Sequence, residues 1–295
     1  MLSSLSRSLS LVLIPLALAA CGPKVSGDDD DDTDAATTTD ARVIDAQGGI
    51  DADETPPSRV YAHSGQMLYR IDTETNAAIA IGPFTNLGTQ SMTDIAVDRD
   101  ERMIGVTLNK IFEVDEATGG CTFLADFTGG SNLTSLSFVP VNAGNPDGPE
   151  MLIAATDTGS VIRIDVAGTT ATATVIGDYG TFGGMDVISS GDIVYVKGVG
   201  TIATVDVGAT LGTDYLATID PANGWAATVI GTGTGFDKIF GVAFWGGQLY
   251  GFTDGGSGMG SFIRLDRQTG TGTLIQAGAV RWFGAGVTTI APLIP

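Results

Sequence analysis

The sequence is short of the residues that most often carry chemistry in proteins. Among its 295 residues it has one histidine, His63, and two cysteines, Cys21 and Cys121. Cys21 lies in a leader where we expect it to be modified, so a single thiol remains. This excludes an intramolecular disulfide and leaves no cysteine cluster for a metal. Cys121 opens an apolar strand pattern, and we expect a buried, unreactive thiol.

Basic residues are scarce as well. The chain has 14 Lys and Arg against 34 Asp and Glu, a formal net charge of −20. Such a chain repels phosphate, which argues against nucleic acid and anionic lipid surfaces as partners. The sequence also lacks Gly-x-Ser-x-Gly, His-Glu-x-x-His and phosphate-binding glycine-loop motifs. Sequence evidence for catalysis is therefore thin.

One apolar run stands near the start of the chain, at residues 9–18, preceded by Arg7. It is too short to span a membrane permanently and small residues follow it, as in secretory signal peptides. Residues 18–22, LAACG, resemble the lipobox of bacterial lipoproteins. The resemblance implies that residues 1–20 are a signal peptide, that Cys21 is lipidated, and that the protein is an outer-membrane lipoprotein facing the periplasm or the cell surface. An ordinary signal peptide with a chance cysteine is the alternative.

Residues 21–57 form an acidic segment with five consecutive aspartates at 28–32. It has no aromatic residue, so it cannot bury enough surface to offset the entropy of ordering. We expect a disordered tether that self-repels and extends. The remaining residues, 58–295, carry 23 acidic and 11 basic residues. They are numerous enough for one sizeable domain.

A short pattern recurs through this domain: an alternating apolar strand that ends on Asp and then breaks into Thr, Asn and Gly. The acids stand 43, 50, 55 and 46 residues apart, at Asp72, Asp115, Asp165, Asp220 and Asp266. Repeats of about 40–50 residues made only of strands are typical of a β-propeller. Each Asp can accept hydrogen bonds from backbone N–H groups two residues on, which explains the spacing as turn chemistry. A metal or catalytic role for the five acids is the alternative.

Further alternating segments complete the pattern, giving four strands in each of five units. The first unit lacks its opening strand, and residues 283–290 supply an extra copy at the end of the chain. We therefore predict an all-β propeller of five four-stranded blades, closed by pairing of this C-terminal strand with residues 59–63. The opening strands should lie at the central axis. The segment at residues 197–213 is interpreted as a long insertion.

The repeats, at residues 59–290, are similar to the YVTN, NHL and quinoprotein-like propeller repeats of exported bacterial proteins. In those repeats a strand ending Ile-Asp precedes a Thr-Gly turn, as in Ile71-Asp72. This resemblance implies a fold and no particular activity, because one fold hosts many functions.

Two functions remain open. The favoured one is a non-enzymatic binding module, monomeric and without a cofactor, whose ligand is a protein, a glycan or a small molecule. The alternative is a metal-dependent hydrolase of lactonase or esterase type, because lactonase-type propellers hold a metal on axial side chains and Asp94 and Asp186 fall in predicted axial strands. His63 could serve as a general base, although an incidental loop or partly buried histidine explains it better.

A ligand is expected at the loops that enter the axial strands and those that join second and third strands, because departures from the repeat are free to carry function. The candidate residues are Asp157, Tyr179, Lys197, Asp237, Lys238, Asp254, Arg281 and Trp282. An exposed Trp282 beside Arg281 would suit the centre of an interface. The competing interpretation is that Trp282 plugs the end of the channel.

Overall fold

The computed structural model describes residues 58–128, 133, 135–208, 212–256, 259–278 and 280–294. The predicted signal peptide, Cys21 and the acidic tether lie outside these residues. Among the described residues, no helix is long and apolar enough to cross a membrane. The regular structure is almost entirely β, with one short 3₁₀ turn at Pro221–Asn223.

The strands form four sheets. The first has the order β21 (Gly284–Gly286), β1 (Val60–His63), β2 (Met67–Asp72) and β3 (Ala77–Pro83). The second has the order β4 (Asp94–Val97), β5 (Met103–Val106), β6 (Lys110–Val114), β7 (Cys121–Phe127), β11 (Thr170–Asp178), β10 (Ser160–Ala167), β9 (Glu150–Ala155) and β8 (Ser137–Pro140).

The third sheet has the order β12 (Thr181–Phe182), β13 (Met185–Val196), β14 (Gly200–Val207), β15 (Tyr215–Asp220) and β16 (Ala226–Ile230). The fourth has the order β17 (Ile239–Trp245), β18 (Gln248–Thr253), β19 (Gly260–Leu265) and β20 (Gly272–Gly278). The eight-stranded sheet consists of two antiparallel halves joined only by a short parallel pairing of β7 with β11.

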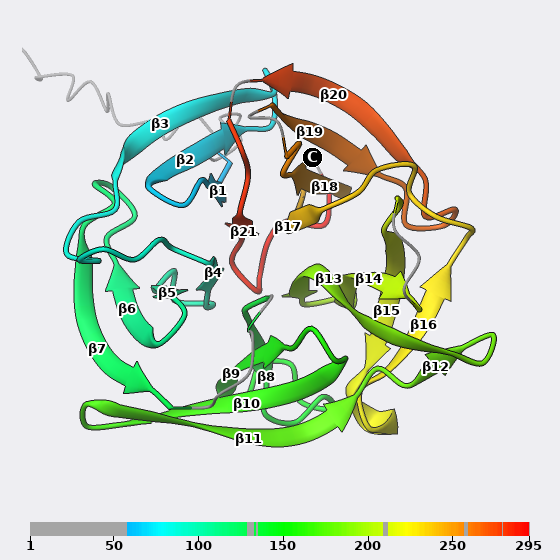
Figure 1. Ribbon diagram of the computed structural model, residues 1–295, viewed down its shortest axis with the longest axis horizontal. Coiled ribbons are helices and arrows are strands. Elements are labelled where there is room, and N and C mark those ends of the chain that lie inside the picture. Colours follow the sequence, from blue (N-terminus) through cyan, green and yellow to red (C-terminus); the bar gives the residue numbers. More distant parts are fainter. Residues whose placement is uncertain are drawn as a thin grey trace, which may run out of the picture. The chain divides into compact units, whose positions relative to one another are not determined.

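The sheets are arranged around a common centre, as in a propeller (Figure 1). Five strands lie innermost: β21, β4, β8, β13 and β17. They are rich in small and fully buried residues, such as the DIAV of β4 and the GAG of β21. Small side chains are favoured here because five backbones converge in a narrow space. The expected axial placement of the opening strands is confirmed for β4, β8, β17 and β21.

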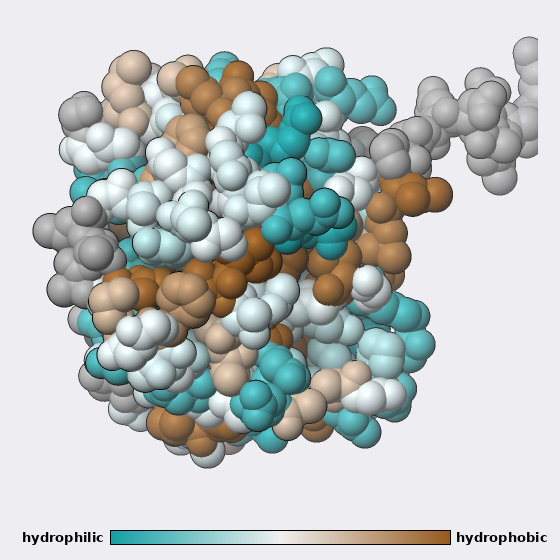
Figure 2. All heavy atoms as spheres, turned by 90° about the vertical axis from the view of Figure 1, so that its right-hand side faces the viewer, coloured by the Kyte–Doolittle hydropathy of each residue, from teal (hydrophilic) through white to brown (hydrophobic). Residues whose placement is uncertain are grey.

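Apolar side chains fill the spaces between neighbouring sheets. The largest cluster joins β13–β15 to β17–β19 and to Val60 and Ala62 of β1. Figure 2 shows an apolar band where the sheet of β12–β16 meets the sheet of β17–β20. Cys121 lies in another such cluster, 2% exposed, and burial raises the pKa of its thiol to about 11. It is a free, buried cysteine, as predicted.

The C-terminal strand closes the ring as predicted. Ala285 of β21 pairs antiparallel with Ala62 of β1, although more than 200 residues separate them. The chain then runs on as residues 287–294, which we call the C-terminal clasp. The clasp forms four hydrogen bonds, to three turns and to the start of β9. Thr288 Oγ1 donates to the Asp98 carbonyl and Thr289 Oγ1 to Glu150, while the Thr289 carbonyl accepts from the Lys197 N–H and the Pro292 carbonyl from the Gly246 N–H.

Turn chemistry explains four of the five repeated acids. The carboxylates of Asp72, Asp115, Asp220 and Asp266 accept hydrogen bonds from backbone N–H groups two residues on, at 2.8–3.0 Å. The prediction is wrong for Asp165, which pairs with Arg163 inside β10. That strand continues to Ala167, and its turn is made at Gly168, whose φ is +61°.

The third sheet also departs from the prediction. The alternating pattern predicts an opening strand at residues 182–187 and a separate second strand at residues 192–196. Instead, residues 185–196 form the single strand β13, with a bulge between Ser189 and Ile193. The supposed insertion at residues 197–213 contains the regular strand β14. Asp186 is exposed on the outer part of β13, and it is not an axial residue.

Candidate functional site

Seven of the eight predicted binding residues lie at one end of the sheets, which we call the loop face. Adjacent strands are antiparallel, so the start of an inner strand and the turn between its second and third strands share an end. The exception is Lys197, which follows the far end of β13 and pairs with Asp147 on the opposite face. The expected place of Lys197 on the loop face is wrong, because the segment expected as an insertion folds into β14 and leaves Lys197 in the turn between β13 and β14.

Three residues of the loop face lie together. Arg281 forms a two-fold ion pair with Asp254, with Nε–Oδ1 and Nη2–Oδ2 distances of 2.7 Å. The hydrogen bonds from Arg281 hold the pKa of Asp254 below its usual range. The Asp254 N–H donates to the carbonyl of Lys238 at 2.9 Å. The loops before β17 and β21 and after β18 therefore form one local unit, and the Arg281 guanidinium is about half exposed.

The predicted aromatic residues are buried. Trp282 is 5% exposed and packs edge-on against Tyr69 of β2 and Phe252 of β18, between two sheets. An exposed Trp–Arg pair is therefore absent here, and the contacts of Trp282 lie within an inter-sheet core. Tyr179 is 1% exposed, and its hydroxyl has no hydrogen-bond partner among the described residues.

A group of acids lies where β14 approaches the start of β17. Asp214 is buried and accepts hydrogen bonds from the backbone N–H groups of Lys238 and Ile239 at 3.3 and 2.7 Å. Burial raises the pKa of Asp214 to about 6. Burial also raises the pKa of the half-buried Asp206, and the charge of exposed Asp237 adds to the shift. This end of the molecule therefore presents negative charge around the backbone of Lys238.

A second polar group is found at the centre of the ring, and we call it the axial cluster: His63, Asp94 and Asp192. His63 ends β1 and is fully buried, whereas the sequence predicted an incidental loop or partly buried histidine. Its Nε2 atom lies 3.8 Å from Asp94 Oδ1. Burial lowers the pKa of His63 to about 4, so its ring is neutral at neutral pH.

Asp192 was not among the predicted site residues. Its Oδ1 accepts from the Ile193 N–H and its Oδ2 from the Val242 N–H of β17, both at 2.7 Å. A sequence signal for it existed: residues 192–194, Asp-Ile-Val, match Asp94-Ile-Ala at the start of β4. Burial raises the pKa of both acids well above the ordinary value, and for Asp94 the charge of Asp192 adds to the effect.

The axial cluster has the residue types of an acid–base site but no access. The exposed fractions of His63, Asp94 and Asp192 are 0%, 1% and 0%. Asp94 and Asp186, the pair on which the hydrolase hypothesis rested, are separated into a buried and an exposed environment. Within the described ranges, no three His, Cys, Asp or Glu side chains are placed to hold one metal ion.

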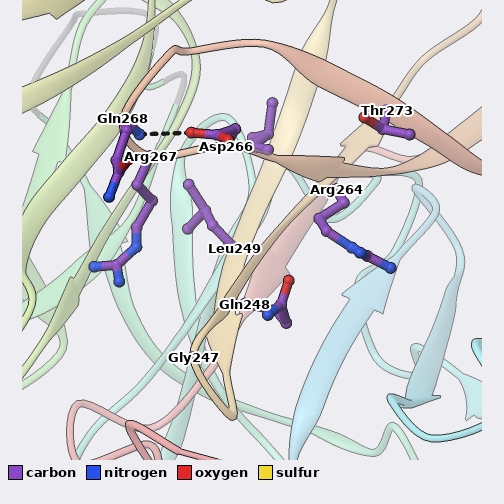
Figure 3. A pocket seen from close by; sticks show the side chains of 9 residues that line it. Gly247, Gln248, Leu249, Arg264, Asp266, Arg267, Gln268 and Thr273 are labelled. Carbon is purple, nitrogen blue, oxygen red and sulfur yellow. Dashed lines mark hydrogen bonds between the residues drawn. The ribbon is translucent and has the colours of Figure 1, made fainter.

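The opposite face carries a cavity of about 740 Å³ on the fourth sheet. It is lined by Gln248, Leu249, Arg264, Arg267 and Thr273, among others. Figure 3 shows the side chains of Arg264 and Arg267 on opposite sides of Leu249, pointing away from each other. Two guanidinium groups arranged in this way do not converge on one small anion.

Comparison with known proteins yields similarity of structure only. No family model matches the sequence, and no curated protein matches it. Similar solved structures include a protein of unknown function from Bacteroides caccae, at 10% identity and a TM-score of 0.38, covering 75% of this chain and 72% of that one.

Another is a Bacteroides fragilis protein assigned provisionally as a 6-phosphogluconolactonase, at 17% identity and a TM-score of 0.36, covering 77% and 69% of the two chains. A third is TolB from Acinetobacter baumannii, at 15% identity and a TM-score of 0.41, covering 74% and 52%. At these scores no function transfers from any of them.

Proposed function

We propose that this protein is a five-bladed propeller of the bacterial cell envelope, anchored by lipid on Cys21, that binds a ligand at its loop face without catalysis. The blade count is supported by dividing the eight-stranded sheet at its parallel β7–β11 pairing, which gives five antiparallel units: four of four strands, and one of five strands in which β12 is the extra strand. An outer-membrane anchor and an extended acidic tether would hold the domain away from the bilayer.

One observation carries the proposal of binding. The polar groups with catalytic potential are buried at the axis, whereas the charged groups of the loop face are exposed on a rigid support. Asp237 and Lys238 are exposed next to the Asp254–Arg281 ion pair and directly before β17. Exposed loop side chains held by regular strands are the common arrangement of binding surfaces. The domain's excess of acids favours a ligand that is neutral or positively charged.

The loop-face site can be tested with the full chain carrying Cys21→Ser, immobilised and screened against arrays of glycans, small metabolites and basic peptides. We expect a bound compound to lose at least about tenfold in affinity, or about 1.4 kcal/mol, when Asp237 and Lys238 are both changed to Ala. Both side chains are exposed, so the melting temperature should be preserved. Glu74→Ala on the opposite face is the matched control. Binding that survives the double change, or turnover of lactone and ester substrates by the unmodified chain, would contradict this proposal.

The lipid anchor gives a separate prediction. Cys21→Ser should move the protein from the membrane fraction to the soluble fraction, or leave it unprocessed, because each buried acyl CH₂ contributes about 0.8 kcal/mol to membrane affinity. Cys121→Ser is the matched control and should remain with the membrane, since that thiol is buried in the domain. Detergent-phase partitioning of both variants measures the difference. An unchanged distribution of Cys21→Ser would remove the lipoprotein assignment.

A further inference from the structure

The two axial acids belong to different sheets, the second and the third. Asp94 begins β4 at one edge of the second sheet and Asp192 lies in β13 of the third, and β8, the other edge of the second sheet, contacts both β4 and β13. Asp94 Oδ1 lies beside Gly284 of β21, Gly284 packs against Gly241 of β17, and the next residue of β17, Val242, donates its N–H to Asp192 Oδ2. Both carboxyl groups are therefore buried at the same place on the axis, and the charge of Asp192 contributes to the raised pKa of Asp94. The contact of Asp94 with Asp192 therefore joins two sheets across the axis.

One oxygen atom of the two carboxyl groups, Asp94 Oδ2, has no hydrogen-bond donor among the described residues. Both oxygens of Asp192 accept from backbone N–H groups, and Asp94 Oδ1 accepts from the Ile95 N–H at 2.8 Å. Asp94 Oδ2 is buried, and none of the described N–H or O–H groups donates to it. A buried carboxylate oxygen without a donor is costly, whereas a carboxyl O–H on that atom could donate to a neighbouring carboxylate.

No positive charge balances the pair. His63 Nε2 is the nearest basic atom to Asp94, at 3.8 Å from Oδ1, and its ring is neutral at neutral pH. The buried Tyr179 hydroxyl lies near Asp192 and also stays neutral, since burial raises its pKa. Within the described residues, neither acid forms an ion pair with Lys or Arg. β21 brings only Gly284, where an added Cβ would collide with Asp94 Oδ1 and His63 Nε2.

Two carboxylates in contact, buried and without a counter-charge, cannot both be ionised. We propose that the folded protein holds one proton between Asp94 and Asp192 at neutral pH, and that this proton bonds β4 to β13 across the axis. The axial cluster is then a proton-binding site that contributes to closure of the ring. This inference is independent of the proposed ligand-binding function.

The sign of the resulting pH dependence follows from linkage. An unfolded Asp has a pKa of about 3.9 and holds no proton at pH 7. The folded chain therefore binds one proton more than the unfolded chain, and its stability falls as pH rises toward the folded pKa of the pair. Asp214, with a raised pKa of about 6, has the same sign but acts below pH 7. His63, whose pKa is lowered, acts with the opposite sign below about pH 6.5. Between pH 7 and 8 the pair makes the largest contribution. The thiol of Cys121, whose pKa burial raises to about 11, adds a smaller contribution of the same sign as pH approaches 8.

The test is urea unfolding of the full chain carrying Cys21→Ser at several values between pH 7 and 8, alongside Asp94→Asn. We expect the folding equilibrium constant of the parent to rise up to about tenfold for each unit that pH falls. Asp94→Asn should lose this slope, because an amide N–H replaces the carboxyl O–H. Asp186→Asn, exposed on β13, should keep it. A parent protein with no slope, or an unchanged slope in Asp94→Asn, would overturn the proposal.

A measurement without substitution keeps the proposal falsifiable if Asp94→Asn does not fold. Calorimetric unfolding of the parent at pH 7.5 in two buffers of different ionisation enthalpy counts the protons released. We expect about one proton per chain, and an infrared C=O band of a protonated carboxyl in the folded state only. Release of no proton together with absence of that band would overturn the proposal.

Discussion

Removing residues 283–295 is expected to prevent folding. The deletion takes away β21, which pairs with Tyr61 to His63 of β1, and leaves backbone groups unpaired at the buried centre. Each unsatisfied buried group costs about 1–3 kcal/mol. Loss of the buried Val287 side chain adds about 1.5–3 kcal/mol. The sum is comparable to the whole stability of a typical domain, about 5–15 kcal/mol.

Two shorter deletions separate strand pairing from the clasp. Removing residues 287–295 keeps β21 but loses all four hydrogen bonds that the clasp forms with the rest of the domain. The melting temperature should fall, but by less than in the 283–295 deletion. Removing residues 294–295 should change little, because Ile294 is 76% exposed. Circular dichroism and thermal melts rank the three proteins. A 283–295 deletion that melted at the parent temperature would contradict the observed ring closure.

Asp192→Ala should be the most destabilising single substitution at the axis. The change leaves the Ile193 and Val242 N–H groups buried without acceptors, at about 1–3 kcal/mol each, so a loss of roughly 2–6 kcal/mol is expected. Chemical denaturation measures it directly. The free energy of unfolding of the whole domain should fall, because the hydrogen bond from Val242 to Asp192 joins the third sheet to the fourth.

Asp186→Ala is the matched control, because the same residue type lies exposed on the same strand. Its effect should stay within about 0.5 kcal/mol. The loss of unfolding free energy in Asp192→Asn should lie between the losses in these two variants. The single amide oxygen can accept only one of the two backbone hydrogen bonds that the two carboxylate oxygens accept. Equal stability of Asp192→Ala and Asp186→Ala would show that the axial hydrogen bonds contribute nothing to the fold.

Local features were predictable from the sequence because the forces behind them act within a few residues. Alternating apolar residues mark strands, and Asp followed by Thr and Gly marks a tight turn. The same reasoning failed at Asp165, where a neighbouring arginine two residues back offered a different partner. It also failed at Ser190-Gly191, where a bulge allowed two strand segments to run on as one.

Site residues were predicted less well because burial is a property of distant contacts. Arg281, Asp254 and Lys238 lie together as expected for one loop face, but Trp282 and Tyr179 are buried by sheets that the local pattern does not identify. Asp192 was missed because residues 192–196 were interpreted as the second strand of their unit, and only the opening strands were expected at the axis. The full burial of His63 was not predicted because nothing near it in sequence indicates the approach of β4 and β21.

The sequence by itself determined the all-β character, the repeating four-strand unit, most of the turns and the return of the last strand to the first, since each follows from side-chain period and turn chemistry within a short segment. Only the tertiary structure decided which polar residues meet at the centre. Asp94 and Asp192 are 98 residues apart in the chain, and the electrostatics of their contact arise solely because five inner strands converge where water and counter-charges are excluded.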